Sequence, residues 1–117
     1  MTHAMNLNPQ PFAMIADGQK TYELRLDDEK RRQIRVGDEI VFTNTAAPER
    51  TLRVRVVALH RFADFAALYA ALPLDQCGYR AEELATASPS DMEAYYTPEK
   101  QRQYGVLGIE IALCPHL

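Results

Sequence analysis

Residues 18–26, GQKTYELRL, combine a glycine turn with a stretch that alternates as a β-strand does. Side chains along a strand point to opposite faces in turn, so this stretch predicts one apolar and one polar face. The apolar face comprises Tyr22, Leu24 and Leu26, and the polar face comprises Thr21, Glu23 and Arg25. Lys20 begins the strand next to Gly18, where an unusual backbone angle can turn the amine toward the polar face. We therefore expect the apolar face to cover a core and the charged face to line a cleft.

Working outward, the chain predicts a helix before this strand and a mixture of strands and helices after it. Asn8 and Pro9 form a helix start signal and Gly18 a stop signal, which predicts a helix over 9–17. Alternating apolar residues predict strands, and apolar residues at helical spacing or a serine–proline start predict helices. The expected strands are 20–26, 39–43, 51–60 and 106–113, and the expected helices after the first are 62–72, 81–85, one starting at Ser88 and 98–103.

The order of these elements is helix, three strands, helices and a final strand. A last strand that must pair with an early one favours a small mixed β-barrel with short helices on one side, in the α+β class. The later part of 51–60 is apolar on both faces, as in a strand that enters a closed barrel. With 117 residues and no internal repeat, the chain is expected to form a single domain, 1–117.

Composition excludes several classes of protein. The chain is 47% hydrophobic and 25% charged, which is typical of a soluble globular protein, and no apolar run approaches the ~20 residues of a membrane span. The start of the chain lacks the pattern of a secretory signal, so we expect a cytoplasmic protein. Cys77 and Cys114 are far apart and are expected to be free thiols. Cysteines and histidines show no metal-ligand spacing, so neither a metal nor another cofactor is expected.

The charge of the chain is unevenly distributed. The net charge is -3, which argues against a protein that coats nucleic acid through bulk electrostatics. Residues 18–61 nevertheless contain ten Lys/Arg and seven Asp/Glu, a net of +3, whereas residues 62–117 contain three and eight, a net of -5. A basic half permits a local site for an anionic ligand.

Lys20, Thr21, Glu23 and Arg25 are the first candidate site. A lysine kept dry can act as a base or nucleophile, and a charged one can stabilise an oxyanion or phosphate. Glu23 and Arg25 are two positions apart on one strand face, close enough for the arginine to orient the carboxylate. The alternative is an ordinary surface ion pair between Glu23 and Arg25, worth ~0–1 kcal/mol.

Tyrosines and arginines elsewhere supply further candidates for ligand binding. Tyr95, Tyr96 and Tyr104 can stack on a nucleobase, although packing of a helix on the barrel explains at least one of them equally well. Arg53 and Arg55 alternate on one strand without an adjacent acid, and are suited either to phosphates or to an ordinary solvated face.

Several motifs together resemble the ASCH domain (activating signal cointegrator homology), a family of the PUA-like superfamily of RNA-associated barrels. The residues that carry the resemblance are Asn6-Leu7-Asn8-Pro9, Pro11-Phe12, Gly18-x-Lys20-x-x-Glu23-x-Arg25, Val36-Gly37-Asp38, Leu59–Phe62 and Tyr104-Gly105-Val106-Leu107-Gly108-Ile109. The resemblance spans nearly the whole chain. It implies a β-barrel with flanking helices and a cleft for RNA, a nucleoside or another nucleotide-like ligand, with Lys20, Glu23 and Arg25 at its floor.

The same resemblance implies two alternative functions. The first is an RNA- or nucleotide-binding domain, with RNA processing as an open extension. The second is an amidohydrolase that removes the acyl group from N4-acetylcytidine-type nucleosides with a lysine, a threonine and a glutamate. In that pattern a threonine stands three residues after the lysine, where this chain has Glu23, and the second carboxylate is left open among Glu82, Glu83 and Glu93. The sequence does not decide whether the chain is an enzyme. It also leaves the oligomeric state open between a monomer and a weak dimer.

Overall fold

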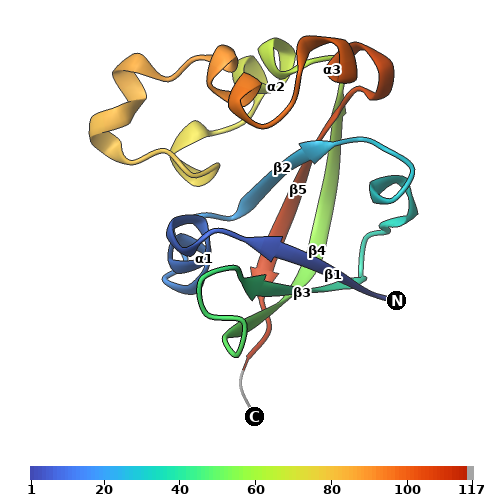
Figure 1. Ribbon diagram of the computed structural model, residues 1–117, viewed down its shortest axis with the longest axis vertical. Coiled ribbons are helices and arrows are strands. Elements are labelled where there is room, and N and C mark those ends of the chain that lie inside the picture. Colours follow the sequence, from blue (N-terminus) through green and yellow to red (C-terminus); the bar gives the residue numbers. More distant parts are fainter. Residues whose placement is uncertain (116–117) are drawn as a thin grey trace.

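The computed structural model describes residues 1–115 and shows a curled five-stranded sheet with short helices at one end and one side (Figure 1). The strands are β1 (Thr2–Leu7), β2 (Tyr22–Leu26), β3 (Glu39–Asn44), β4 (Thr51–Phe62) and β5 (Val106–Leu113). Their order across the sheet is β1-β3-β4-β5-β2. The sheet curls into a half-barrel, which confirms the α+β, PUA-like fold expected from the sequence.

β1 was not predicted, so the expected order beginning with a helix was wrong. This strand pairs in parallel with β3, from Thr2 opposite Glu39 to Leu7 opposite Asn44. Only two of its side chains, Met5 and Leu7, are buried. An edge strand with so few inward apolar residues carries a weak alternation signal. Its partner also lies far along the chain, so no neighbouring segment indicates the pairing.

The remaining pairs are antiparallel and bring distant parts of the chain together. β3 pairs with β4, β4 with β5, and β5 with β2, where Glu23 lies opposite Ile109. A register shift between Val56 and Ala58 marks a bulge in β4. As expected, the last strand lies beside the first predicted one.

The helices differ in length and type from the prediction. The α-helices are α1 (Pro9–Ala16), α2 (Phe65–Ala71) and α3 (Pro98–Tyr104), and the 3₁₀ helices are η1 (Arg31–Gln33), η2 (Leu74–Gln76), η3 (Ala81–Thr86) and η4 (Pro89–Ala94). Residues up to Phe62 extend β4, so α2 begins later than predicted, at the Asp64 cap. Residues 81–86 and 89–94 are 3₁₀ helices without a buried residue, because these stretches lack an apolar stripe for an α-helix to bury.

The apolar core consists of two clusters. The first joins α1 to the sheet through β1, β3, β4 and β5, with Phe12, Ile40 and Phe42 among its buried members. The second packs β2 against α2, with Leu24, Phe65 and Leu68. Among the residues of 1–115, no helix is both long and apolar enough to cross a bilayer.

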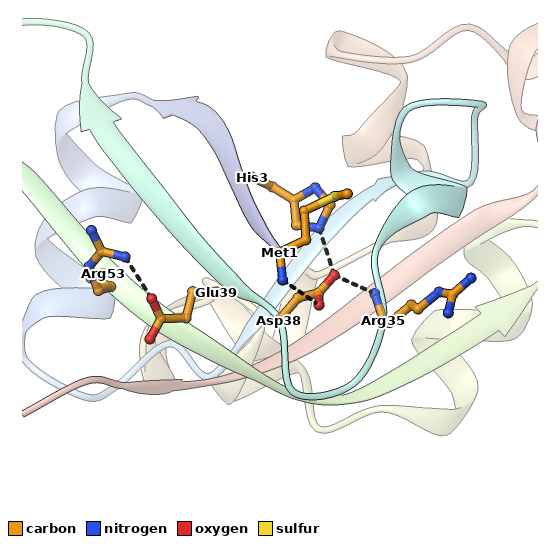
Figure 2. A network of polar contacts seen from close by, with 6 residues as sticks. All are labelled: Met1, His3, Arg35, Asp38, Glu39 and Arg53. Atoms are coloured by element: carbon orange, nitrogen blue, oxygen red, sulfur yellow. Dashed lines mark hydrogen bonds and ion pairs between the residues drawn. The ribbon is translucent and has the colours of Figure 1, made fainter.

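The turn before β3 is tied to β1 by a network around Asp38 (Figure 2). Asp38 Oδ2 lies 2.8 Å from His3 Nε2 and accepts from the Arg35 main-chain N–H at 3.0 Å, and Oδ1 contacts the Met1 amine at 3.2 Å. Hydrogen bonds from His3 and then from the Arg35 amide lower the pKa of Asp38 to about 2. The ionised carboxylate therefore holds the turn against β1 and supports the parallel pairing.

Candidate functional site

The backbone around β2 is held in place by segments on both sides. Gly18 has a φ of 86°, which ends α1 and reverses the chain, and Lys20 N–H then donates to Met14 O at 3.0 Å. Thr21 N–H donates to Gln76 O, in η2, at 2.9 Å. Positive φ favours glycine at the turn, and the two main-chain bonds fix the direction in which Lys20 leaves the backbone.

Lys20, Glu23 and Arg25 form a buried ion-pair network of three residues, which we call the floor. Lys20 Nζ lies 2.9 Å from Glu23 Oε1, and Arg25 donates to Glu23 Oε2 from Nη2 at 2.8 Å and from Nε at 3.1 Å. The side chains of Lys20, Glu23 and Arg25 are 8%, 6% and 15% exposed. They are therefore not the solvated surface pair that was the alternative interpretation of the sequence.

The floor carries one unit of net positive charge. Burial would raise the pKa of Glu23, but the charges of Lys20 and then Arg25 outweigh it and hold the pKa below its ordinary value of 4.5. For Arg25, burial would lower the pKa, but the charge of Glu23 raises it. One anion thus lies between two cations, and both of its oxygens are engaged by them.

The floor opens into a cavity of about 660 Å³. Its lining comes from the end of β1 and the start of α1, from the floor, and from the segment 69–96 that carries the 3₁₀ helices. The residues that line it are Asn6, Leu7, Asn8, Gln10, Pro11, Met14, Lys20, Glu23, Leu24, Arg25, Tyr69, Cys77, Gly78, Tyr79, Glu83, Asp91, Met92, Tyr95 and Tyr96. This volume lies within the ~300–1,000 Å³ of small-molecule sites.

Gly78 lies against the Lys20 amine. A Cβ placed on Gly78 would be 3.4 Å from Lys20 Nζ, and the φ of Gly78 is 116°. The backbone angle favours glycine here, and a methyl group at this position would be in van der Waals contact with the lysine amine. The neighbouring thiol, Cys77, is buried, and burial raises its pKa to about 11 although the Lys20 charge opposes this.

The structure brings together some of the residues singled out in the sequence. Lys20, Glu23, Arg25, Tyr95 and Tyr96 all border the cavity. Tyr95 is 68% exposed at its rim, whereas Tyr96 is half-buried with its ring stacked on Phe65 at a centroid distance of 6.0 Å.

Other candidates lie elsewhere. Thr21 is outside the cavity lining, and its hydroxyl donates to Gln76 Oε1 at 2.8 Å. Tyr104 packs against the second apolar cluster instead of lining the cavity. Arg53 and Arg55 lie on β4 beside β3, where Arg53 contacts Glu39 Oε1 at 2.6 Å (Figure 2), and neither lines the cavity. Strand alternation alone did not show that the sheet presents two separate polar faces.

Of the three carboxylates left open for the second acid, only Glu83 borders the cavity. Its Oε1 accepts from the Arg80 main-chain N–H at 2.8 Å in a cap of η3. Glu82 and Glu93 do not line the cavity, and both are exposed. The sequence placed all three in the helical region without a signal to separate them.

Sequence reasoning missed Tyr69, Gly78, Tyr79 and Asp91, which also line the cavity. Tyr69 falls within the predicted helix 62–72 and Asp91 just after the helix start at Ser88, and neither carried a signal of its own. Gly78 was the one weak signal, because a glycine in a loop indicates a close approach or an unusual backbone angle.

A model of the ASCH domain family matches residues 5–115. The chain belongs to the ASCH domain family. This match spans nearly the whole half-barrel, including every residue that lines the cavity.

Solved structures of similar fold agree with this membership. The crystal structure of the hypothetical protein PH0355 is 29% identical, with a TM-score of 0.80 over 97% of this ASCH domain and 100% of that chain. The solution structure of protein PF0455 from Pyrococcus furiosus is 30% identical, with a TM-score of 0.75 over 99% and 100%. A point mutant of the ASCH protein of Zymomonas mobilis shares the fold at 15% identity, with a TM-score of 0.62 over 94% and 68%. A comparison with curated proteins gave no match.

Proposed function

We propose that this ASCH domain binds a nucleotide of single-stranded RNA in the cavity, with a phosphate at the floor and the base toward the tyrosine rim. The observation that carries the proposal is the buried floor, where Lys20 and Arg25 share the single carboxylate of Glu23. A buried site with one uncompensated positive charge favours an anionic partner.

The floor also has donors left for such a partner. Lys20 uses one of its three N–H donors on Glu23. Arg25 uses Nε and Nη2 on Glu23 and Asn6, and the Tyr96 side chain also lies against its guanidinium, so the free donors of the floor are mainly those of Lys20. Lysine and arginine donors that are held in place by a carboxylate suit phosphate oxygens, because little side-chain entropy is lost on binding.

The rim supplies a surface for a base. Tyr95 is exposed beside Tyr96, with ring centroids 6.4 Å apart. Stacking of a base on such a ring contributes ~1–3 kcal/mol. Tyr96 is already stacked on Phe65 and is thereby fixed in position, so Tyr95 is the ring we assign to the base.

The test is a titration of the protein with a short, fluorescently labelled single-stranded RNA at low salt. Lys20→Met keeps most of the aliphatic stem and removes the charge, and we expect it to weaken binding roughly tenfold or more. Arg53→Met, which removes one positive charge outside the cavity, is the matched control and should change binding little. Thermal unfolding of each variant verifies that it is folded.

Equal losses from Lys20→Met and Arg53→Met would mean that RNA is attracted by general charge and not by the cavity. Absence of any binding by the folded wild-type protein would refute the proposal.

A second function, hydrolysis of an N4-acetylcytidine-type nucleoside, is favoured by one observation: Glu83 borders the same cavity as Lys20. The oxygens of Glu23 are engaged by Lys20 and Arg25, so Glu83 is the carboxylate that would move a proton. Incubation with N4-acetylcytidine tests this reaction. Release of acetate that is lost in Glu83→Gln and in Lys20→Met would establish it, and no release would leave binding as the function.

A further inference from the structure

Apart from the floor, three other side chains of the cavity form a chain of short hydrogen bonds. The Tyr69 and Tyr79 hydroxyl oxygens are 2.6 Å apart, and Tyr79 donates to Asp91 Oδ2 at 2.6 Å. Tyr69 belongs to α2, Tyr79 to the loop between η2 and η3, and Asp91 to η4. All three line the cavity, and we call them the wall.

The direction of these hydrogen bonds is fixed. The hydrogen bond from Tyr79 and then that from the Ser88 amide lower the pKa of Asp91, so its carboxylate is ionised and can only accept. Tyr79 has a single proton, which it donates to Asp91, and burial raises its pKa, so it keeps that proton. The Tyr69 hydroxyl must therefore be the donor to the Tyr79 oxygen. Each hydroxyl proton of the wall is already used within the wall.

The wall consequently offers only acceptors to a ligand. Asp91 Oδ2 receives both Tyr79 and the Ser88 main-chain N–H, the latter at 3.1 Å. Asp91 Oδ1 forms no hydrogen bond with any residue of 1–115 and is free to accept from the cavity. The floor offers N–H donors and the wall offers acceptors to the same cavity.

We propose that Asp91 selects nucleobases that carry an exocyclic amino group over those that carry a keto oxygen at the same position. This inference rests on the proposed function and names which nucleotides that same cavity prefers. Cytosine and adenine present N4 and N6 amino donors, whereas uracil and hypoxanthine present an oxygen there. An amino group donates to Asp91 Oδ1, and a keto oxygen in the same place meets the negative charge of a carboxylate.

The geometry around Asp91 provides a direct variant. In Asp91→Asn, Tyr79 and Ser88 both donate to one position, so the amide oxygen must take the place of Oδ2. The amide N–H₂ then takes the place of Oδ1 and faces the ligand as a donor. The variant should therefore reverse the preference, and it keeps the shape of the side chain and the cap of η4.

The experiment measures the affinities of four mononucleotides, CMP, UMP, AMP and IMP, for wild-type and variant proteins by calorimetry or NMR titration. CMP and UMP, like AMP and IMP, differ at the base edge mainly by one exchange. CMP and AMP carry an amino group where UMP and IMP carry a keto oxygen. We expect the wild type to bind the amino member roughly tenfold more tightly, the size of one hydrogen bond to a charged group. Asp91→Asn should favour the keto member of each pair.

Two controls distinguish Asp91 from its neighbours. Tyr69→Phe removes the hydroxyl that does not contact Asp91 and leaves Tyr79 donating to Asp91, so the amino preference should persist. Glu83→Gln changes a carboxylate of the cavity that belongs neither to the wall nor to the floor, and it should also leave the preference unchanged.

Two outcomes separate the two proposals. Binding without an amino preference, or a preference that Asp91→Asn leaves unchanged, would overturn this inference and leave the proposed function standing. If none of the four nucleotides, nor RNA, binds to folded wild-type protein, the proposed function fails and this inference fails with it.

Discussion

The guanidinium of Arg25 donates from Nη2 to the main-chain oxygen of Asn6 at 3.0 Å. Asn6 belongs to β1 and Arg25 to β2, which are the two edge strands of the sheet. The sheet curls so that its first and last strands approach each other, and this one side chain spans the gap between them. The same guanidinium orients Glu23, so the closure of the half-barrel and the geometry of the floor depend on one residue.

Arg25→Lys should separate charge from geometry. A lysine keeps the positive charge but lacks the planar fork that contacts Glu23 twice and Asn6 once. We expect a loss of about 1–2 kcal/mol in the free energy of unfolding. Hydrogen exchange should quicken at the main-chain amides of β1. Arg53→Lys on β4 is the control and should leave β1 protected; equal exchange in the two variants would contradict the bridging role.

Glu23→Gln should destabilise the protein in a pH-dependent way. The folded pKa of Glu23 is lowered, so its ionised form adds stability above the ordinary value of 4.5, and that stability is lost as the pH falls through the lower folded value. At neutral pH we expect a cost of roughly 3 kcal/mol, because two buried cations lose their partner. Urea unfolding measured from pH 7 down to pH 3 should show the difference between wild type and variant shrinking toward acid. A constant difference would indicate that the carboxylate charge is unimportant.

Gly78→Ala and Gly18→Ala form a matched pair. Both glycines have positive φ, so each substitution should cost about 1–3 kcal/mol in strain. Only at Gly78 does the new methyl group meet the Lys20 side chain, whereas a Cβ on Gly18 meets nothing within 4 Å. RNA binding at a temperature where both variants are folded should therefore weaken in Gly78→Ala and stay unchanged in Gly18→Ala. Similar binding by both would remove Gly78 from the site.

RNA binding should weaken with salt, because phosphate contacts release counterions. If the floor neutralises the charge of one phosphate, raising the salt from ~50 to ~200 mM should lower the affinity roughly two- to threefold. Lys20→Met should reduce the slope of log affinity against log salt by about 0.7. An affinity that does not respond to salt would point to a small uncharged ligand in the cavity.

The fold could be predicted from the sequence where local signals agree with the final structure. The helix over 9–17 has a proline at its start and Gly18 just beyond its end, and the closing strand is largely apolar apart from Glu110, so both were placed within a residue or two. β1 was missed because its partner β3 lies more than thirty residues away and only Met5 and Leu7 turn inward. Its pairing depends on tertiary contacts that no local pattern contains.

The candidate site was predictable in part, from one strand segment and from Tyr95 and Tyr96 at the rim. Lys20, Glu23 and Arg25 share a short segment whose alternation brings them together, and the structure shows them in contact. The wall comes from three elements that no spacing relates, so Tyr79 and Asp91 could not be found from the sequence. Arg53 and Arg55 illustrate the opposite error, since a regular strand pattern does not tell which side of a sheet bears the cavity.

The segment 74–96 contains three 3₁₀ helices and no strand, so side chains and a few loop bonds alone hold it against the sheet. Its local opening should cost less free energy than unfolding of β4 or β5. A compound that contacts both Lys20 and Asp91 would link this segment to the floor, stabilise the closed state and so make that opening rarer. Deuterium uptake over residues 79–91 would therefore detect occupancy, including by compounds that barely change the melting temperature, and offers a direct way to screen for the natural ligand.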